Sequence, residues 1–217
     1  MIDLHTHTLF SDGELVPSEL IRRAQAVGLR AIALADHADM STLDWILPRV
    51  IRACEENSAA RSIRCLPGIE LTHVPPSLIA RYVAEARARG ARLVVVHGES
   101  PVEPVEPGSN RAAIEAGADI LSHPGLISEE DARLAAAKGV HLEISARRGH
   151  SLTNGHVVAL ARRTGAPLVL NTDAHAPGDL IPESFAQVVA SGAGLTDREY
   201  AALRANMERL AGLTGEA

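Results

Sequence analysis

Short apolar segments alternate with longer amphipathic segments along nearly the whole chain. The apolar segments are typical of buried strands. The expected strands are Ile2–His5, Ala31–Ala35, Ile63–Ile69, Arg92–His97, Asp119–Ser122, Val140–Ile144 and Leu168–Asn171. The expected helices are Pro17–Val27, Leu43–Ser58, Ser77–Arg89, Asn110–Ala116, Glu129–Lys138 and Gly155–Thr164, followed by a helical region over Ser184–Ala190 and Asp197–Leu210. Strands that each lead into a helix predict a parallel sheet covered by helices on both faces.

Two α/β architectures satisfy this alternation. If the sheet closes on itself, it forms a seven-stranded relative of the eight-stranded TIM barrel. If it stays open, it forms a doubly wound sheet. The chain of 217 residues has no evident linker or shift in composition. A chain of this length fits one domain, so we expect a single domain over residues 1–217.

Polar side chains follow the strands at the points where they end. They are His5, His7 and Asp12 after the first strand, Asp36 and His37 after the second, Glu70 on the third, His97 on the fourth, His123 after the fifth, and Asp173 and His175 after the seventh. The carboxyl ends of parallel strands meet at one mouth of a barrel, where barrel active sites lie. We therefore expect these side chains to converge there.

Several carboxylates and imidazoles at one mouth need compensation, because burying an unpaired charge is costly. Divalent ions neutralise carboxylates and commonly use imidazole as a nitrogen ligand. A mixed set without cysteine suits Zn²⁺, Mn²⁺ or Fe²⁺ better than a structural zinc site. The sequence therefore predicts a cluster of divalent ions at the mouth.

Charge and composition argue against some partners. The net charge is −6, and the chain has only two Phe, one Trp and two Tyr. A long nucleic acid usually requires a basic surface and stacking rings, so we do not expect one as substrate. No apolar run is long enough to span a membrane, and no secretory signal is evident. We expect no membrane partner and a cytoplasmic location; the sequence predicts no particular oligomeric state.

Six short motifs each close a strand: His-x-His at 5–7, Asp-His at 36–37, Gly-Ile-Glu at 68–70, His-Gly at 97–98, Ser-His-Pro at 122–124 and Asp-Ala-His at 173–175. At these residues the chain resembles the PHP family (polymerase and histidinol phosphatase) along essentially its whole length. The resemblance implies a distorted (βα)₇ TIM-like barrel with three metal ions. It implies one ion on His5, His7, Glu70 and Asp173, a second on the bridging Glu70 with His97 and His123, and a third on Asp12, His37 and His175.

The amidohydrolases are a competing family, because they also open a barrel with His-x-His. Many of them bridge two metals with a carbamylated lysine. The single lysine here, Lys138, lies on a predicted helix just before Gly139. It is therefore poorly placed as a bridge, which favours a bridging carboxylate at Glu70.

The expected function is a metal-dependent phosphoesterase that hydrolyses a small phosphorylated metabolite, in the manner of histidinol phosphatase. A metal-bridging hydroxide would attack phosphorus. Arg147, with Arg148 as second choice, is the candidate for holding the substrate phosphate. Asp36 is a candidate for proton transfer or for orienting a ligand histidine. The alternatives are a 3′–5′ exonuclease or an oligonucleotide or cyclic phosphodiesterase, and a non-catalytic metal-binding module.

The longest irregular stretch is Gly98–Gly108, which contains several acidic residues and prolines. We expect a semi-rigid loop at the strand ends and a candidate lid. His73 is expected either to line the mouth or to pack beside Pro75 and Pro76. His150 is a candidate substrate contact.

Overall fold

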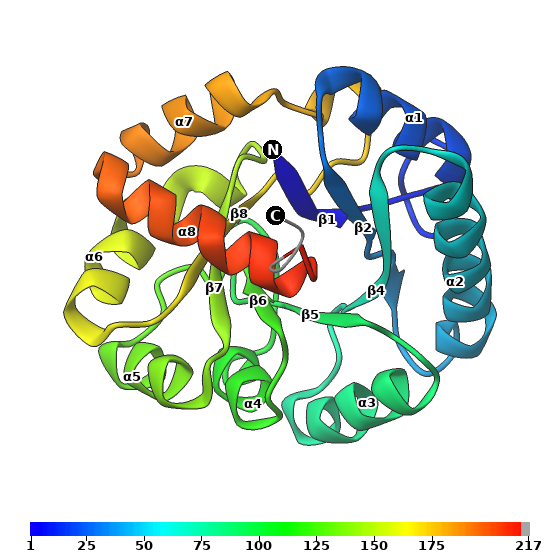
Figure 1. Cartoon of the computed structure of the whole chain (residues 1–217). Helices are drawn as coiled ribbons and strands as arrows, with labels where there is room; N and C mark the ends of the chain where they lie inside the picture. Colours follow the sequence, from blue (N-terminus) through cyan, green and yellow to red (C-terminus); the bar gives the residue numbers. More distant parts are fainter. Residues whose placement is uncertain (214–217) are drawn as a thin grey trace.

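Seven parallel strands form the wall of a nearly closed barrel in the computed structural model, which describes residues 1–213 (Figure 1). Along the wall the strands are β1 (Ile2–Thr6), β2 (Ala31–Leu34), β4 (Arg64–Leu71), β5 (Leu93–His97), β6 (Ile120–Ser122), β7 (His141–Ser145) and β8 (Leu168–Asn171). A short eighth strand, β3 (His37–Ala38), also pairs with β4 and places His37 beside Glu70.

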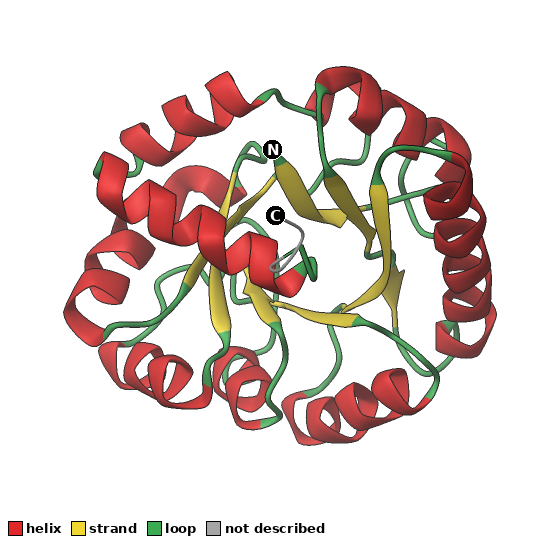
Figure 2. Ribbon diagram, viewed as in Figure 1, coloured by secondary structure: helices red, strands yellow, loops and turns green. Residues whose placement is uncertain are grey.

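The helices surround the strands as an outer layer (Figure 2). They are α1 (Pro17–Val27), α2 (Leu43–Ala60), α3 (Pro76–Ala88), α4 (Ser109–Glu115), α5 (Glu129–Lys138), α6 (Asn154–Thr164), α7 (Glu183–Gly192) and α8 (Asp197–Leu210), with short 3₁₀ helices at His150–Thr153 and Pro177–Asp179. Local signals set their limits. Pro17 opens α1, and Gly28, at φ 99°, closes it by donating its N–H to the last carbonyls of the helix.

The barrel closes between β1 and β8 by few backbone contacts. A single parallel bridge joins Thr6 to Ala174, and the His7 N–H donates to the Ala174 carbonyl at 2.9 Å. The Asn171 side chain adds to this closure, because its Oδ1 accepts from the Leu4 N–H at 2.8 Å. The barrel is therefore closed but distorted at this seam.

Side chains that alternate along β1 and β7 divide the barrel into an apolar outside and a polar inside. Leu4 and Ile144 belong to the apolar core that the helices cover. His5 and Glu143 instead point inward and meet across the barrel, with His5 Nδ1 2.8 Å from Glu143 Oε2. Both are fully buried. The inner faces of these strands therefore have ionisable side chains where a TIM barrel usually has aliphatic ones.

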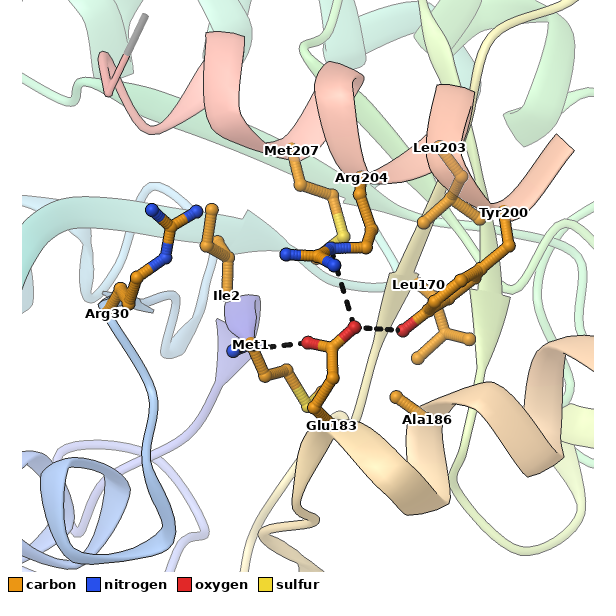
Figure 3. Close-up of a pocket in the computed structure, with 10 residues that line it drawn as sticks. All are labelled: Met1, Ile2, Arg30, Leu170, Glu183, Ala186, Tyr200, Leu203, Arg204 and Met207. Atoms are coloured by element: carbon orange, nitrogen blue, oxygen red, sulfur yellow. Dashed lines mark hydrogen bonds and ion pairs between the residues drawn. The ribbon is translucent and has the colours of Figure 1, made fainter. Parts of the chain in front are cut away.

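Helix α8 lies across the end of the barrel where the strands begin (Figure 1). Figure 3 shows the contact between α7 and α8 at this end. Glu183 accepts a hydrogen bond from the Tyr200 hydroxyl at 2.7 Å and lies 3.2 Å from the Met1 amino group and 3.4 Å from Arg204 Nε. These polar contacts sit among Leu170, Leu203 and Met207.

The predicted fold class is confirmed, and the doubly wound alternative is excluded by the contact between β1 and β8. Helices α1, α5 and α8 have the predicted limits, whereas β3 and both 3₁₀ helices were not predicted. The prediction of one domain over residues 1–217 includes residues 214–217, which lie outside the described residues, so its extent stays a prediction. Within residues 1–213, no helix has the length and apolar character needed to cross a membrane.

We expect Glu183→Gln to lower the free energy of unfolding by about 1 kcal/mol, because the Tyr200 hydroxyl and the Met1 amino group lose their negatively charged partner. Partial burial raises the pKa of Glu183, but the Tyr200 hydroxyl and the Met1 amino group lower it to below its usual value. The deficit should therefore persist at neutral pH and vanish only in acid, where the wild-type carboxylate is protonated. Urea unfolding measures this, with Glu55→Gln on the exposed face of α2 as control. Equal stability of both variants at pH 7 would contradict the expectation.

Candidate metal centre

The structure brings all nine predicted metal ligands to the carboxyl ends of the strands. Within each of four overlapping sets, the candidate ligand atoms lie within 4.8 Å of one another. The sets are His5, His7 and Glu70; His5, His123 and Asp173; Glu70, His97 and His123; and His7, Asp12, His37 and His175. Because the sets share members, the nine residues form one continuous cluster.

Glu70 lies at the centre of this cluster and is fully buried. Its Oε1 lies 3.2 Å from His5 Nε2, and its Oε2 lies 2.7 Å from His37 Nδ1. Ser122 Oγ also donates to Oε1 at 2.7 Å. Burial raises the pKa of Glu70, but the charges of His5 and His37 outweigh it and hold this pKa well below its usual range. The centre is therefore organised around an ionised carboxylate with two oxygens facing different imidazoles.

Asp173 follows β8 and faces the other side of the cluster. Its Oδ1 lies 3.1 Å from His7 Nε2, and its Oδ2 lies 3.7 Å from His123 Nε2. Burial raises its pKa, but the charge of His5 and the close approach of His7 leave this pKa far below the usual value. Asp173 therefore adds a second ionised carboxylate to the cluster.

Strained backbone is concentrated at this mouth. Among residues 1–213, the residues other than glycine with positive φ are His73 at 51°, His123 at 26° and Asp173 at 51°. Each follows a strand, and left-handed backbone is costly for residues with a β-carbon. Such strain persists where the surroundings fix the side chain in place, as they do here.

The outer edge of the cluster is more open to solvent. Asp12 Oδ1 lies 3.1 Å from His175 Nε2 and 3.5 Å from His37 Nε2. Partial burial raises the pKa of Asp12, but the hydrogen bond from His175 and the charge of His37 lower it to about 2. The structure thus brings together the three side chains that were predicted for a third ion.

Unpartnered buried atoms test whether the cluster fits metal ions. Within residues 1–213, the buried side-chain nitrogen and oxygen atoms without a hydrogen-bond partner are His5 Nε2, His7 Nδ1 and Nε2, His123 Nδ1, Glu143 Oε1 and Asp173 Oδ1. Leaving such atoms unpaired is costly, so six in one place require a partner. Divalent ions accept lone pairs from both imidazole and carboxylate, so the donor set fits them.

The protonation of two histidines agrees with this fit. Burial lowers the pKa of His7 to about 3, and it lowers the pKa of His123 well below its usual value. Both rings are therefore neutral at pH 7 and have a free lone pair. A metal ligand must be in that state. Burial acts in the same direction on His5 and His37, but nearby carboxylates outweigh it and raise the pKa values of both, so these two rings would release a proton when an ion binds.

Glu143 holds one histidine of the cluster in place. Its Oε2 accepts from His5 Nδ1 at 2.8 Å and from Asn171 Nδ2 at 2.9 Å. With Nδ1 donating to Glu143, His5 presents Nε2 toward Glu70. In the sequence, Glu143 is a lone carboxylate inside an apolar strand, a pattern that indicates a polar interior but does not predict this contact.

The three predicted catalytic residues differ in position. Arg147 lines the cavity at the mouth, where its Nη1 donates to the Asp173 carbonyl at 2.9 Å and to His175 Nδ1 at 2.5 Å. Arg148 is the next residue of the same loop, and its side chain is exposed to solvent and does not line the cavity, whereas the side chain of Arg147 does.

Asp36 also stays outside the cavity lining, contrary to a catalytic role. Its buried carboxylate accepts from the Thr8 N–H at 2.7 Å and from Ser11 Oγ at 2.8 Å. It shows no hydrogen bond to a ligand histidine within residues 1–213. Asp36 therefore fixes the loop that carries Asp12, which is a positioning role different from both predicted ones.

The cavity above the cluster measures about 230 Å³. Besides Arg147 and the predicted ligands, its lining includes Thr72, His73, Glu103 and His150. Glu103 comes from the predicted acidic loop, which indeed lies at the mouth. Glu103 was not predicted as a site residue, because its neighbours in the chain carry no metal-binding pattern.

Known proteins resemble this chain in sequence. The PHP domain family model matches residues 3–103, the segment that carries His5 through His97. An uncharacterized protein of Methanocaldococcus jannaschii is 48% identical over 199 residues, which cover 91% of each chain. A 5′–3′ exoribonuclease of Haemophilus influenzae is 48% identical over 42 residues, which cover 19% of this chain and 15% of the relative.

Solved structures share the fold at low sequence identity. A chain in the structure of archaeal ribonuclease P with mature tRNA matches with a TM-score of 0.72 and 16% identity, over 98% of this chain and 90% of the other. A Bifidobacterium adolescentis protein, provisionally named a metal-dependent phosphoesterase, matches with a TM-score of 0.51 and 19% identity, over 91% and 97%. The matched segment, the barrel and the clustered motifs agree: the chain belongs to the PHP domain family.

Proposed function

We propose that this protein is a metal-dependent phosphoesterase whose centre takes three divalent ions, drawn from Zn²⁺, Mn²⁺ and Fe²⁺. The observation that carries the proposal is the buried cluster of imidazoles and carboxylates with unpartnered atoms, beneath a cavity that Arg147 also lines. When bound, the ions would supply polarisation of the phosphoryl group and activation of water near neutral pH. We assign His5, His7, Glu70 and Asp173 to one ion, Glu70, His97 and His123 to a second, and Asp12, His37 and His175 to a third.

Arg147 is the proposed phosphate-binding residue. Its guanidinium is held at the cavity by the Asp173 carbonyl and His175 and still has other N–H groups to offer a substrate. A guanidinium binds phosphate oxygens with two parallel hydrogen bonds. Arg147 would therefore orient the phosphoryl group over the cluster, while Glu143 and Asn171 keep His5 in position.

A small phosphorylated metabolite is the proposed substrate class, with histidinol phosphate as one member. The cavity of about 230 Å³ is smaller than pockets for drug-sized ligands, which span roughly 300–1,000 Å³. Acidic side chains, Asp12 and Glu103 among them, share its lining with Arg147. A small cavity with one guanidinium suits a single phosphate group better than a polyanion.

A nuclease or phosphodiesterase is the second candidate. The short match to a 5′–3′ exoribonuclease favours an oligonucleotide substrate. The net charge of −6 weighs against long chains of phosphates. A non-catalytic module is the third candidate, and the full set of nine ligand-type residues weighs against it. The cytoplasmic location stays a prediction.

We expect His5→Ala and Asp173→Ala to lower metal-dependent turnover of p-nitrophenyl phosphate at least about 1,000-fold while the barrel still folds. Both changes remove a group at the centre of the cluster and leave the apolar core intact. Steady-state kinetics and circular dichroism measure this. His141→Gln is the control, because His141 lies at the opposite end of β7 and its Nδ1 pairs with the Asp119 carbonyl. Full activity in either cluster variant would count against the proposal.

We expect Arg147→Ala to raise KM for p-nitrophenyl phosphate at least about 10-fold, because it removes the cation that faces the substrate phosphate. Arg148→Ala should change KM less than about twofold, since Arg148 is exposed outside the cavity lining. Equal effects of the two substitutions would remove Arg147 from the site. The same assay with bis-p-nitrophenyl phosphate separates monoester from diester preference.

We expect Glu143→Gln to weaken binding of one metal ion about 10- to 100-fold, because His5 loses the carboxylate that fixes its ring and raises its basicity. A calorimetric titration of the metal-free protein with Mn²⁺ measures this affinity. Asn171→Ala should have a smaller effect in the same direction. An unchanged binding isotherm in Glu143→Gln would show that His5 does not depend on Glu143.

A further inference from the structure

Glu103 lies among three imidazoles at the rim of the cavity. Its Oε2 is 3.1 Å from His97 Nε2 and 3.2 Å from His73 Nε2, and its Oε1 is 3.4 Å from His150 Nε2. Both carboxylate oxygens of Glu103 therefore face ring nitrogens.

The loop that carries Glu103 is held tightly against the barrel. Glu99 Oε1 accepts from the backbone N–H groups of Gly108 and Asn110 at 3.0 and 2.9 Å. Gly125, at φ 62°, lets the loop approach so closely that a β-carbon there would lie 1.9 Å from the Glu99 carbonyl oxygen. Ser100 Oγ lies 2.6 Å from His150 Nδ1. The position of Glu103 is therefore built into the loop.

His73 reaches the same place from the end of β4. It lines the cavity, and its backbone is left-handed. Among residues 1–213, residues other than glycine adopt this conformation only at the mouth. The His73 side chain is 40% exposed, and its ring lies beside Glu103 and His97.

The three side chains have the spacing of ligands on one ion. Nitrogen and oxygen ligands bind zinc at about 2.0–2.2 Å, so two neighbouring ligands of one ion lie roughly 3–3.5 Å apart. The Glu103 to His97 and Glu103 to His73 distances fall in this range, and all three ligand atoms lie within 4.8 Å of one another. Two imidazoles and a carboxylate are also a donor set that zinc uses.

We propose that His73, His97 and Glu103 form an additional cation position at the rim of the cavity, which shares His97 with the second position of the proposed centre. It takes a divalent ion with affinity for imidazole, such as Zn²⁺. It binds more weakly than the inner positions, because His73 and Glu103 are open to solvent whereas Glu70 and His123 are buried. The rim position ties the loop Gly98–Gly108 to the barrel through the ion.

His97 links the rim position to the inner centre. Its Nδ1 lies 3.1 Å from the Gly98 carbonyl oxygen and donates to it, so only Nε2 is free for a metal. That nitrogen serves either the rim position or the inner set of Glu70, His97 and His123, but not both at once. The rim position therefore fills at metal concentrations above those that load the inner centre, and it then draws His97 away from Glu70. This step rests on the proposed metal centre.

The test is a calorimetric titration of the metal-free, full-length protein with Zn²⁺ alone, in wild type, Glu103→Gln and Glu106→Gln. Glu106 is an exposed carboxylate of the same loop outside the cavity lining, so its substitution is the matched control. Wild type and Glu106→Gln should bind one weak ion after the tight ones, and Glu103→Gln should bind that ion at least about 10-fold more weakly. Hydrogen exchange of residues 98–108 should slow at the weak step in the first two proteins only.

His73→Gln supplies a second variant outside the loop and should lose the same weak step. A weak step unchanged in both Glu103→Gln and His73→Gln would overturn the rim position and leave the inner centre standing. Tight binding without any weak step in wild type would do the same. Absence of all Zn²⁺ binding by wild type would overturn the inner centre and the rim position together.

Discussion

The buried, ionised carboxylate of Glu70 at the middle of the barrel determines which side chains can surround it. Glu70 is fully buried, and its charge is stable there only because His5, His37 and Ser122 surround it. A buried carboxylate without such partners would be neutral or would unfold the barrel. The polar interior is therefore a requirement of the site, and stability has to come from the apolar outer faces of the strands and the helices that cover them.

Barrel closure and site geometry share the same side chains. Asn171 accepts from the Leu4 N–H across the seam between β8 and β1 and donates to Glu143, which in turn holds His5. Because the seam has a single backbone bridge, these side-chain contacts carry much of the closure. The orientation of a proposed metal ligand is thereby coupled to the way in which the first and last strands meet.

Much of the fold followed from the sequence, because strand and helix limits depend on local patterns. The run from Pro17 to Gly28 contains its own start and stop signals, and α1 has those limits. The nine candidate ligands were found because each lies at the end of a strand or in the loop that follows it, and parallel strands end at one mouth. The direction in which a side chain points was harder to predict from the sequence. Neighbours Arg147 and Arg148 differ only in which way the loop turns them, and Asp36 is engaged by Thr8 and Ser11 in a loop contact that no spacing encodes. Glu103 and His73 meet through the predicted loop and a left-handed residue, and no local pattern predicts their contact.

The central claim is that this cluster is a metal centre for phosphoester hydrolysis. The most direct test is metal content per chain of freshly purified protein, measured together with turnover of p-nitrophenyl phosphate and bis-p-nitrophenyl phosphate. We expect two to three tightly bound ions per chain and turnover of the monoester that is lost on chelation and restored by Mn²⁺ or Zn²⁺. Protein without bound metal that stays inactive on both esters after these ions are added would contradict it.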